Sequence, residues 1–143
     1  MAPAKPKQEF FPLGREDLIR LDKQRAFVLD LARRLDLSPA FSGGVADLQI
    51  LQRIVDSKAL KAGQTWELQC LGIVLGDVFA SERDLRWVIV EDEYGRDPAL
   101  RYRNTSNLVF PLTMISKRVE DGKKVELQGI YDGVSDLIAD FRE

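Results

Sequence analysis

Histidine is absent from this 143-residue sequence, and cysteine occurs once. Without an imidazole the chain cannot build a Ser-His-Asp or Cys-His catalytic site, a His-ligated zinc site, or the most common general base. A single cysteine cannot form a disulfide within the chain. Most hydrolase designs are therefore excluded, and the stability of the fold has to come from the packing of its core.

An excess of one charge is also missing, since 21 Lys and Arg face 23 Asp and Glu, for a net charge of −2. Nucleic acids and anionic membranes favour clustered Lys and Arg, so neither is expected as a partner, and a basic protein is an easier fit. The longest apolar run, Cys70 to Gly76, is seven residues long, against about 20 for a membrane span. The first thirteen residues lack the apolar segment of a signal peptide, which predicts a cytoplasmic protein.

Residues 1–14 hold three of the six prolines and show no helical or strand periodicity. This composition predicts a flexible N-terminal arm, in which Phe10 and Phe11 could dock, before a single domain over residues 15–143. Apolar residues then recur at helical spacing from Leu18 to Leu35, which predicts a first helix that ends before Ser38-Pro39.

A second helix is expected from Leu48 up to Gly63, and a third from Trp66 to Ala80. The third segment is apolar on nearly every side, which predicts the most buried helix of the fold. Gly72 and Gly76 lie four residues apart on it, so another part of the chain is expected to approach closely there. Cys70 lies in the same run, where burial suppresses thiolate chemistry and favours a structural role.

From Trp87 the hydrophobic period changes to two, which predicts a strand. The segment Tyr94–Pro98 has the residue types of a turn, and Ala99–Arg103 alternates again, so the two runs are interpreted as a hairpin. A short strand over Leu108–Phe110 is expected to follow.

Pro111 can open a helix through Val119, and an apolar stripe from Leu127 to Phe141 predicts a last helix. The predicted class is therefore α+β, with an N-terminal helical layer, a small antiparallel sheet over about residues 87–110 and two C-terminal helices.

The densest polar segment is EDEYGRD, which begins at Glu91. Glu91 and Glu93 project from one face of a strand about 7 Å apart, a spacing that could bind Mg²⁺ or form an acid/base pair. A hairpin that closes around Asp97 would instead set Glu93 opposite Arg101. It would likewise set Glu91 opposite Arg103, and such cross-strand ion pairs stabilise sheets while keeping carboxylates ionised. The ion-pair interpretation is favoured over catalysis.

Three stretches resemble a known bacterial family: LQCLGIVLGD from Leu68, WVIVEDEYGRDPALR from Trp87 and FPLTMISKRVE from Phe110. They are similar to the domain of unknown function number 3806, over roughly residues 64–140. The resemblance implies no established activity, cofactor or catalytic residue. It leaves the arm and the first two predicted helices outside the family.

Exclusion leaves a non-enzymatic, protein-binding domain as the leading hypothesis, with an immunity protein that neutralises a cognate bacterial toxin as its specific form. No cofactor and no metal are predicted. The alternative is an enzyme or divalent-metal-binding domain that uses the carboxylates of Glu91, Asp92, Glu93 and Asp97.

The predicted contact surface combines the hairpin tip with the acidic face of the last helix. Tyr and Arg are enriched among residues that dominate binding energy, and a turn presents them at low entropic cost. Two alternatives stay open, namely that Tyr94 folds back onto the core and that Arg96 pairs with Asp97. The predicted contact residues are Tyr94, Arg96, Asp97, Asp92, Asp132, Asp136 and Asp140.

Overall fold

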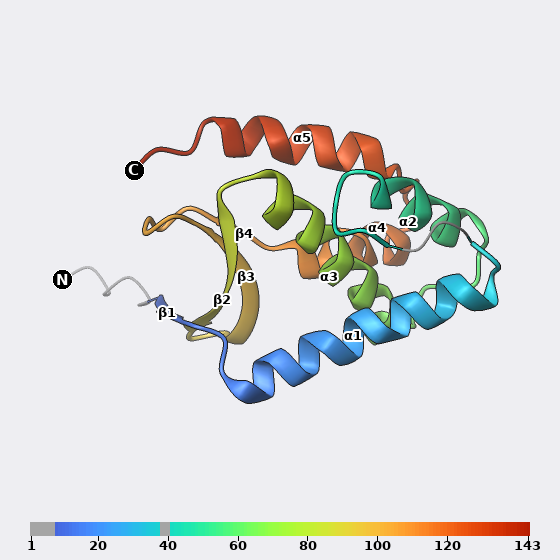
Figure 1. Cartoon of the computed structure of the whole chain (residues 1–143), viewed down its shortest axis with the longest axis horizontal. Helices are drawn as coiled ribbons and strands as arrows, with labels where there is room; N and C mark the ends of the chain where they lie inside the picture. The colour runs from blue at the N-terminus through green and yellow to red at the C-terminus, as the bar shows by residue number, and fades with distance from the viewer. Residues whose placement is uncertain (1–7, 38–40) are drawn as a thin grey trace.

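A computed structural model describes residues 8–37 and 41–143 and confirms the α+β fold (Figure 1). In chain order the elements are β1 (Glu9–Phe11), α1 (Arg15–Arg34), α2 (Asp47–Asp56), α3 (Thr65–Glu82), β2 (Leu85–Asp92), β3 (Gly95–Tyr102), β4 (Leu108–Val109), the 3-10 helix η1 (Pro111–Thr113), α4 (Ser116–Glu120) and α5 (Leu127–Ala139). No helix in this part of the chain is both long and apolar enough to cross a membrane.

Helix α3 lies at the centre of the molecule, as its apolar sequence predicts. Helices α1, α2, η1 and α4 and strand β2 all pack against it. The predicted close approach is confirmed, because a Cβ atom added to Gly72 would lie 2.5 Å from the carbonyl oxygen of Leu112. A Cβ atom on Gly76 would meet the ring of Trp87. Glycine at both positions therefore lets η1 and β2 lie against the helix.

The sheet is antiparallel throughout, in the order β1-β2-β3-β4. One face contributes Leu85 and Leu100 to the main core, which it shares with the helices. The opposite face carries a smaller cluster of Val88, Val90 and Ala99. Period-two alternation thus places apolar side chains on both faces, as expected for a sheet in which neither face is fully open to water.

The expectation of a flexible arm is wrong for residues 9–11, whereas residues 1–7 lie outside the described part of the chain. Phe10 pairs with Val90 and Phe11 with Ile89, so β1 completes the sheet beside β2. The strand forms because the unpaired edge of β2 presents backbone donors and acceptors to a nearby extended segment. It was not predicted because three residues are too few to show a strand periodicity.

Two helices also differ in length from their predictions. Helix α2 ends at Asp56 rather than near Gly63, because Lys58 adopts a left-handed backbone with a φ of 62° that stops the helix. The segment expected to be one helix from Pro111 divides into η1 and α4. Pro111 occupies the first position of η1, as predicted, but the following residues turn to pack on Gly72.

The predicted hairpin register is wrong. The chain reverses at Glu93 and Tyr94, so Asp92 lies opposite Gly95 and Glu91 lies opposite Arg96. Gly95 has a φ of +132°, a conformation that other residues rarely adopt, and this fixes the position of the turn. Most of the segment expected to form the turn, Tyr94–Pro98, instead lies within β3, including Asp97, around which the hairpin was expected to close.

Pro98 is tolerated in β3 because β4 pairs only with Leu100 and Arg101 and leaves that part of the strand uncovered. The proline signal, which favoured a turn at this point, therefore marks an edge of the sheet. The difference shifts every cross-strand partner of the predicted hairpin.

Candidate functional site

The turn between β2 and β3 exposes an aromatic side chain to solvent. Tyr94 is 86% exposed, the highest value among the large apolar and aromatic residues of the described chain. Its backbone N–H donates to Oδ1 of Asp92 at 2.8 Å, a local contact that fixes the turn. The alternative in which Tyr94 folds back onto the core does not occur, and the ring contributes little to the packing of the fold.

Arg96, next to the turn, binds the beginning of helix α1 rather than Asp97. Its two terminal nitrogens donate to Oδ1 and Oδ2 of Asp17 at 2.9 and 3.2 Å. Asp17 is only 3% exposed, and its Oδ2 also accepts the backbone N–H of Gly14 at 2.9 Å. The hydrogen bonds from Arg96 and then from Gly14 hold the pKa of the Asp17 carboxyl below its ordinary value of 3.8. This contact anchors the base of the turn to α1.

Two exposed apolar residues follow Asp17 directly on α1. Leu18 is 48% exposed and Ile19 is 47% exposed. Leu18 was predicted to be part of the buried stripe, but the buried face runs through Asp17, Leu21 and positions further along the helix. We call Tyr94, Arg96, Leu18 and Ile19 the turn surface. Sequence reasoning missed its α1 half because the helical spacing of Leu18 is equally compatible with burial.

The acidic part of the predicted contact surface lies elsewhere. Asp132, Asp136 and Asp140 are exposed along and just after α5, which packs on α2. Figure 1 shows α5 and the turn between β2 and β3 on opposite sides of the molecule. The residues predicted to form one surface therefore belong to two separate surfaces.

The four carboxylates of the alternative hypothesis do not converge. Asp92 is engaged with the turn backbone, and Glu91 lies across from Arg96 in the ladder. Asp97 lies opposite Val90, on the exposed part of β3. In residues 8–37 and 41–143 no group of three or more His, Cys, Asp or Glu side chains is placed to hold a metal ion.

The predicted cross-strand ion pairs do not form, because the register sets Glu91 opposite Arg96 and Arg101 opposite Arg86, and both arginines of the predicted pairs have other partners. The Arg101 guanidinium lies 4.3 Å from the centre of the Phe10 ring and donates to the carbonyl oxygen of Thr105 at 2.6 Å. Arg103 binds Asp84 at 2.7 Å and Glu143 at 2.8 Å. The arginines therefore tie β3 and the residue after it to β1, to the adjoining loops and to the C-terminal segment.

Cys70 has the structural role that its sequence context predicts. Its side chain is completely buried in α3, and this burial, with a smaller contribution from the negative charge of Glu67, raises the pKa of the thiol to about 12. The thiolate is therefore scarce at neutral pH.

Comparison with known proteins gives a family and a fold. The sequence pattern of a family described as "Domain of unknown function (DUF3806)" matches residues 47–131. The match begins at the start of α2, earlier than the resemblance over residues 64–140 indicated, so the second helix lies within the family. It also includes the turn between β2 and β3. No curated protein matches this chain.

A solved structure shares the architecture. It is a crystal structure from Bacteroides thetaiotaomicron VPI-5482 at 1.50 Å resolution, with a TM-score of 0.80 and 19% sequence identity. The similarity covers 90% of this chain and 47% of the other, so this chain spans about half the length of that protein. At this level of identity the likeness shows the fold alone.

Proposed function

This chain belongs to the DUF3806 family of domains of unknown function, and we propose that it acts as a non-enzymatic domain that binds another protein through the turn surface. The observation that carries this proposal is Tyr94, an aromatic residue that is 86% exposed on a turn held by two sets of contacts. Aromatic residues and arginine supply most of the energy at protein interfaces, and the proposal assigns that role to Tyr94.

The contacts below Tyr94 support a binding role because they reduce the entropy that association would cost. Asp92 holds the backbone of the turn, and the bidentate contact of Arg96 with buried Asp17 ties the strand to α1. A partner would therefore meet a turn whose backbone is already ordered. Leu18 and Ile19, which directly follow Asp17, add exposed apolar side chains to the part of α1 that Arg96 contacts.

The narrower form of the proposal is an immunity protein that neutralises a basic toxin in the bacterial cytoplasm. Its support is the exposed carboxylates of Asp132, Asp136 and Asp140, which would complement a basic partner. These residues lie away from the turn surface. A basic toxin would therefore contact both the turn surface and the acidic face of α5, or it would contact only one of these two surfaces.

A photoreactive residue tests the broader proposal directly. p-Benzoylphenylalanine is placed at position 94, and in a matched variant at position 137 on α5, where Leu137 is 56% exposed. Illumination in living cells of the source organism should join position 94 to one protein that position 137 does not reach. Crosslinking only from position 137, or from neither position, would contradict a partner at the turn surface.

The toxin hypothesis is tested with the protein identified in that experiment. Expression of the captured protein alone should arrest growth, and co-expression of this chain should restore it. The Tyr94→Ala variant should fail to restore growth while accumulating to the wild-type level. A captured protein without toxicity leaves the binding role intact and contradicts the immunity role.

A further inference from the structure

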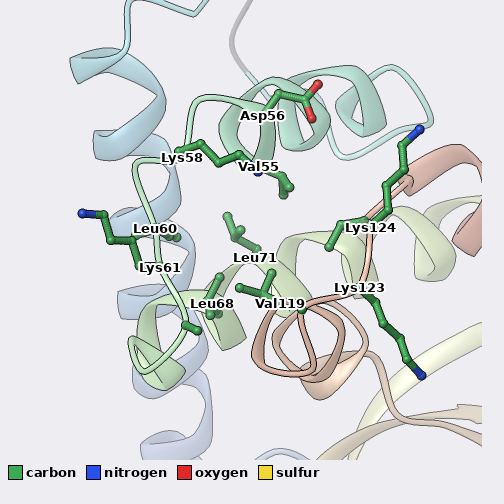
Figure 2. Close-up of a pocket in the computed structure, with 13 residues that line it drawn as sticks. Val55, Asp56, Lys58, Leu60, Lys61, Leu68, Leu71, Val119, Lys123 and Lys124 are labelled. Atoms are coloured by element: carbon green, nitrogen blue, oxygen red, sulfur yellow. The ribbon is translucent and has the colours of Figure 1, made fainter.

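A cavity of about 480 Å³ opens between the loop that joins α2 to α3 and the loop that joins α4 to α5 (Figure 2). Its size is within the range of small-molecule binding sites, about 300–1,000 Å³. The turn surface belongs to the turn between β2 and β3 and to the beginning of α1, and none of its four residues lines the cavity. The cavity is therefore independent of the surface proposed to bind a protein.

The floor of the cavity is aliphatic. Among the described residues that line it, none is aromatic and none has a hydroxyl or amide side chain. A sugar or a nucleobase that lay on this floor would lose hydrogen bonds to water, and the aliphatic side chains of the floor could not replace them, whereas a hydrocarbon chain would lose none. The floor is formed by Val55, Leu60, Leu68, Leu71, Val119 and Val125.

The rim of the cavity is positively charged, although the chain as a whole carries a net charge of −2. Lys58, Lys61, Lys123 and Lys124 surround the opening, with Asp56 as the one acidic residue among the described lining residues. Figure 2 shows the Lys58 side chain running toward Val55, while the other three extend away into solvent. Within residues 8–37 and 41–143, none of these four ammonium groups forms a salt bridge.

The walls of the cavity are held in place by polar contacts between distant segments. The Gln52 side chain on α2 donates to the carbonyl oxygen of Val125 at 3.0 Å and accepts the backbone N–H of Leu127 at 2.7 Å. The Thr65 hydroxyl, at the start of α3, donates to Oε1 of Glu120 at 2.7 Å. These contacts hold the loop between α4 and α5 on α2, and the end of α4 on the start of α3, so two of the cavity walls are fixed by the fold itself.

From the aliphatic floor and the cationic rim we propose that this cavity binds a small anion that carries an unbranched hydrocarbon chain, a medium-chain carboxylate. The chain would lie over the floor, and the carboxylate would lie at the rim, where the flexible lysine stems can bring ammonium groups to it. Lys58 is already directed over the floor. The other lysines supply positive potential at the opening.

Titration calorimetry with the full chain tests this proposal, with sodium decanoate below its micelle-forming concentration as the probe. Binding should be saturable with one site. Octanoate should bind more weakly, by about fourfold for each methylene removed. Decyltrimethylammonium has the same chain and the opposite charge, and it should bind at least tenfold more weakly than decanoate. Equal affinity for the two head groups, or no saturable binding of decanoate, would overturn the proposal.

Two variants and a matched control locate the site. Leu60→Trp fills the floor and should weaken decanoate binding at least tenfold, and Lys123→Glu with Lys124→Glu should weaken it at least fivefold. Lys23→Glu with Lys117→Glu makes the same change of charge away from the cavity and should change the affinity less than twofold. Melting curves verify that each variant is folded.

Amide chemical shifts provide a readout that does not depend on any substitution. Decanoate should shift the amides of Val55, Lys58 and Val119 in the wild-type chain, and it should leave those of Tyr94 and Arg96 unchanged. Shifts confined to other surfaces would contradict the proposal. Binding of an acidic peptide, but not of decanoate, at the same amides would identify the cavity as a peptide site and also contradict it.

Discussion

Helix α3 and the turn between β2 and β3 use their side chains in opposite ways. In α3 residues on all sides are buried, including Leu71, Leu75 and Phe79, and its two glycines admit other segments to within van der Waals contact. In the turn the largest side chain, Tyr94, is 86% exposed, and polar contacts beneath it maintain the conformation. The comparison separates residues that stabilise the fold, such as those of α3, from Tyr94, which the fold holds in solvent without depending on it for stability.

The largest effect should come from Gly72, where α3 meets η1. An alanine Cβ would lie 2.5 and 2.6 Å from two carbonyl oxygens of the backbone, which cannot move as a flexible side chain can. We expect Gly72→Ala to lower the free energy of unfolding by about 3 kcal/mol.

Gly133→Ala on α5 is the matched control, because nothing lies within 4 Å of its Cβ position. There alanine should stabilise the helix by about 0.5–1 kcal/mol, the usual difference from glycine. Urea unfolding of both variants measures the two changes. Equal effects at the two positions would mean that η1 does not rest on α3 as described.

A smaller loss is expected at Cys70. Replacing this buried thiol by alanine should cost about 1–3 kcal/mol, because it leaves a void among packed side chains. Since burial raises the thiol pKa to about 12, a thiol reagent at pH 8 should label the native protein far more slowly than the urea-unfolded protein. Labelling at the same rate in both states would contradict the buried position of the residue.

The contact below the turn should show a distinct pH dependence. Because Arg96 and Gly14 lower the pKa of Asp17 in the folded state, the ionised carboxylate favours folding at pH values above its ordinary value of 3.8. This contribution is lost as the pH falls through that value toward the lower folded-state pKa.

We therefore expect Arg96→Ala to lower the melting temperature by a few degrees at pH 7, and the difference from wild type to shrink below pH 4. The control is Arg86→Ala, which removes a guanidinium that binds the backbone and a side chain of an exposed loop. For this variant the difference in melting temperature from wild type should not shrink below pH 4. A difference that is independent of pH would argue against Asp17 as the partner.

The helical part of the fold could be predicted from the sequence because it depends on local periodicity. The all-round apolar run of α3 and the spacing of Gly72 and Gly76 indicated burial and close packing, and both are observed. The end of α2 and the start of α4 were less predictable, since a left-handed Lys58 and a contact of η1 with α3 are set by tertiary structure.

The candidate site was only partly predictable, because register and long-range partners leave no local signal. The prediction placed the turn over Tyr94–Pro98 with the hairpin closing around Asp97, whereas the chain reverses at Glu93 and Tyr94, just before Gly95 with its positive φ. The partner of Arg96 is 79 residues away in the sequence, a distance at which spacing carries no information. The sequence left open whether Tyr94 is exposed or folds back onto the core, and only the fold decides between the two.

The central claim is that Tyr94 serves binding and not stability, and Tyr94→Ala tests it most directly. The free energy of unfolding should stay within about 0.5 kcal/mol of wild type, as for other exposed positions. The affinity for the protein crosslinked from position 94 should fall at least about tenfold, or 1.4 kcal/mol. Unchanged affinity in a stably folded variant, or a large loss of stability, would contradict the account.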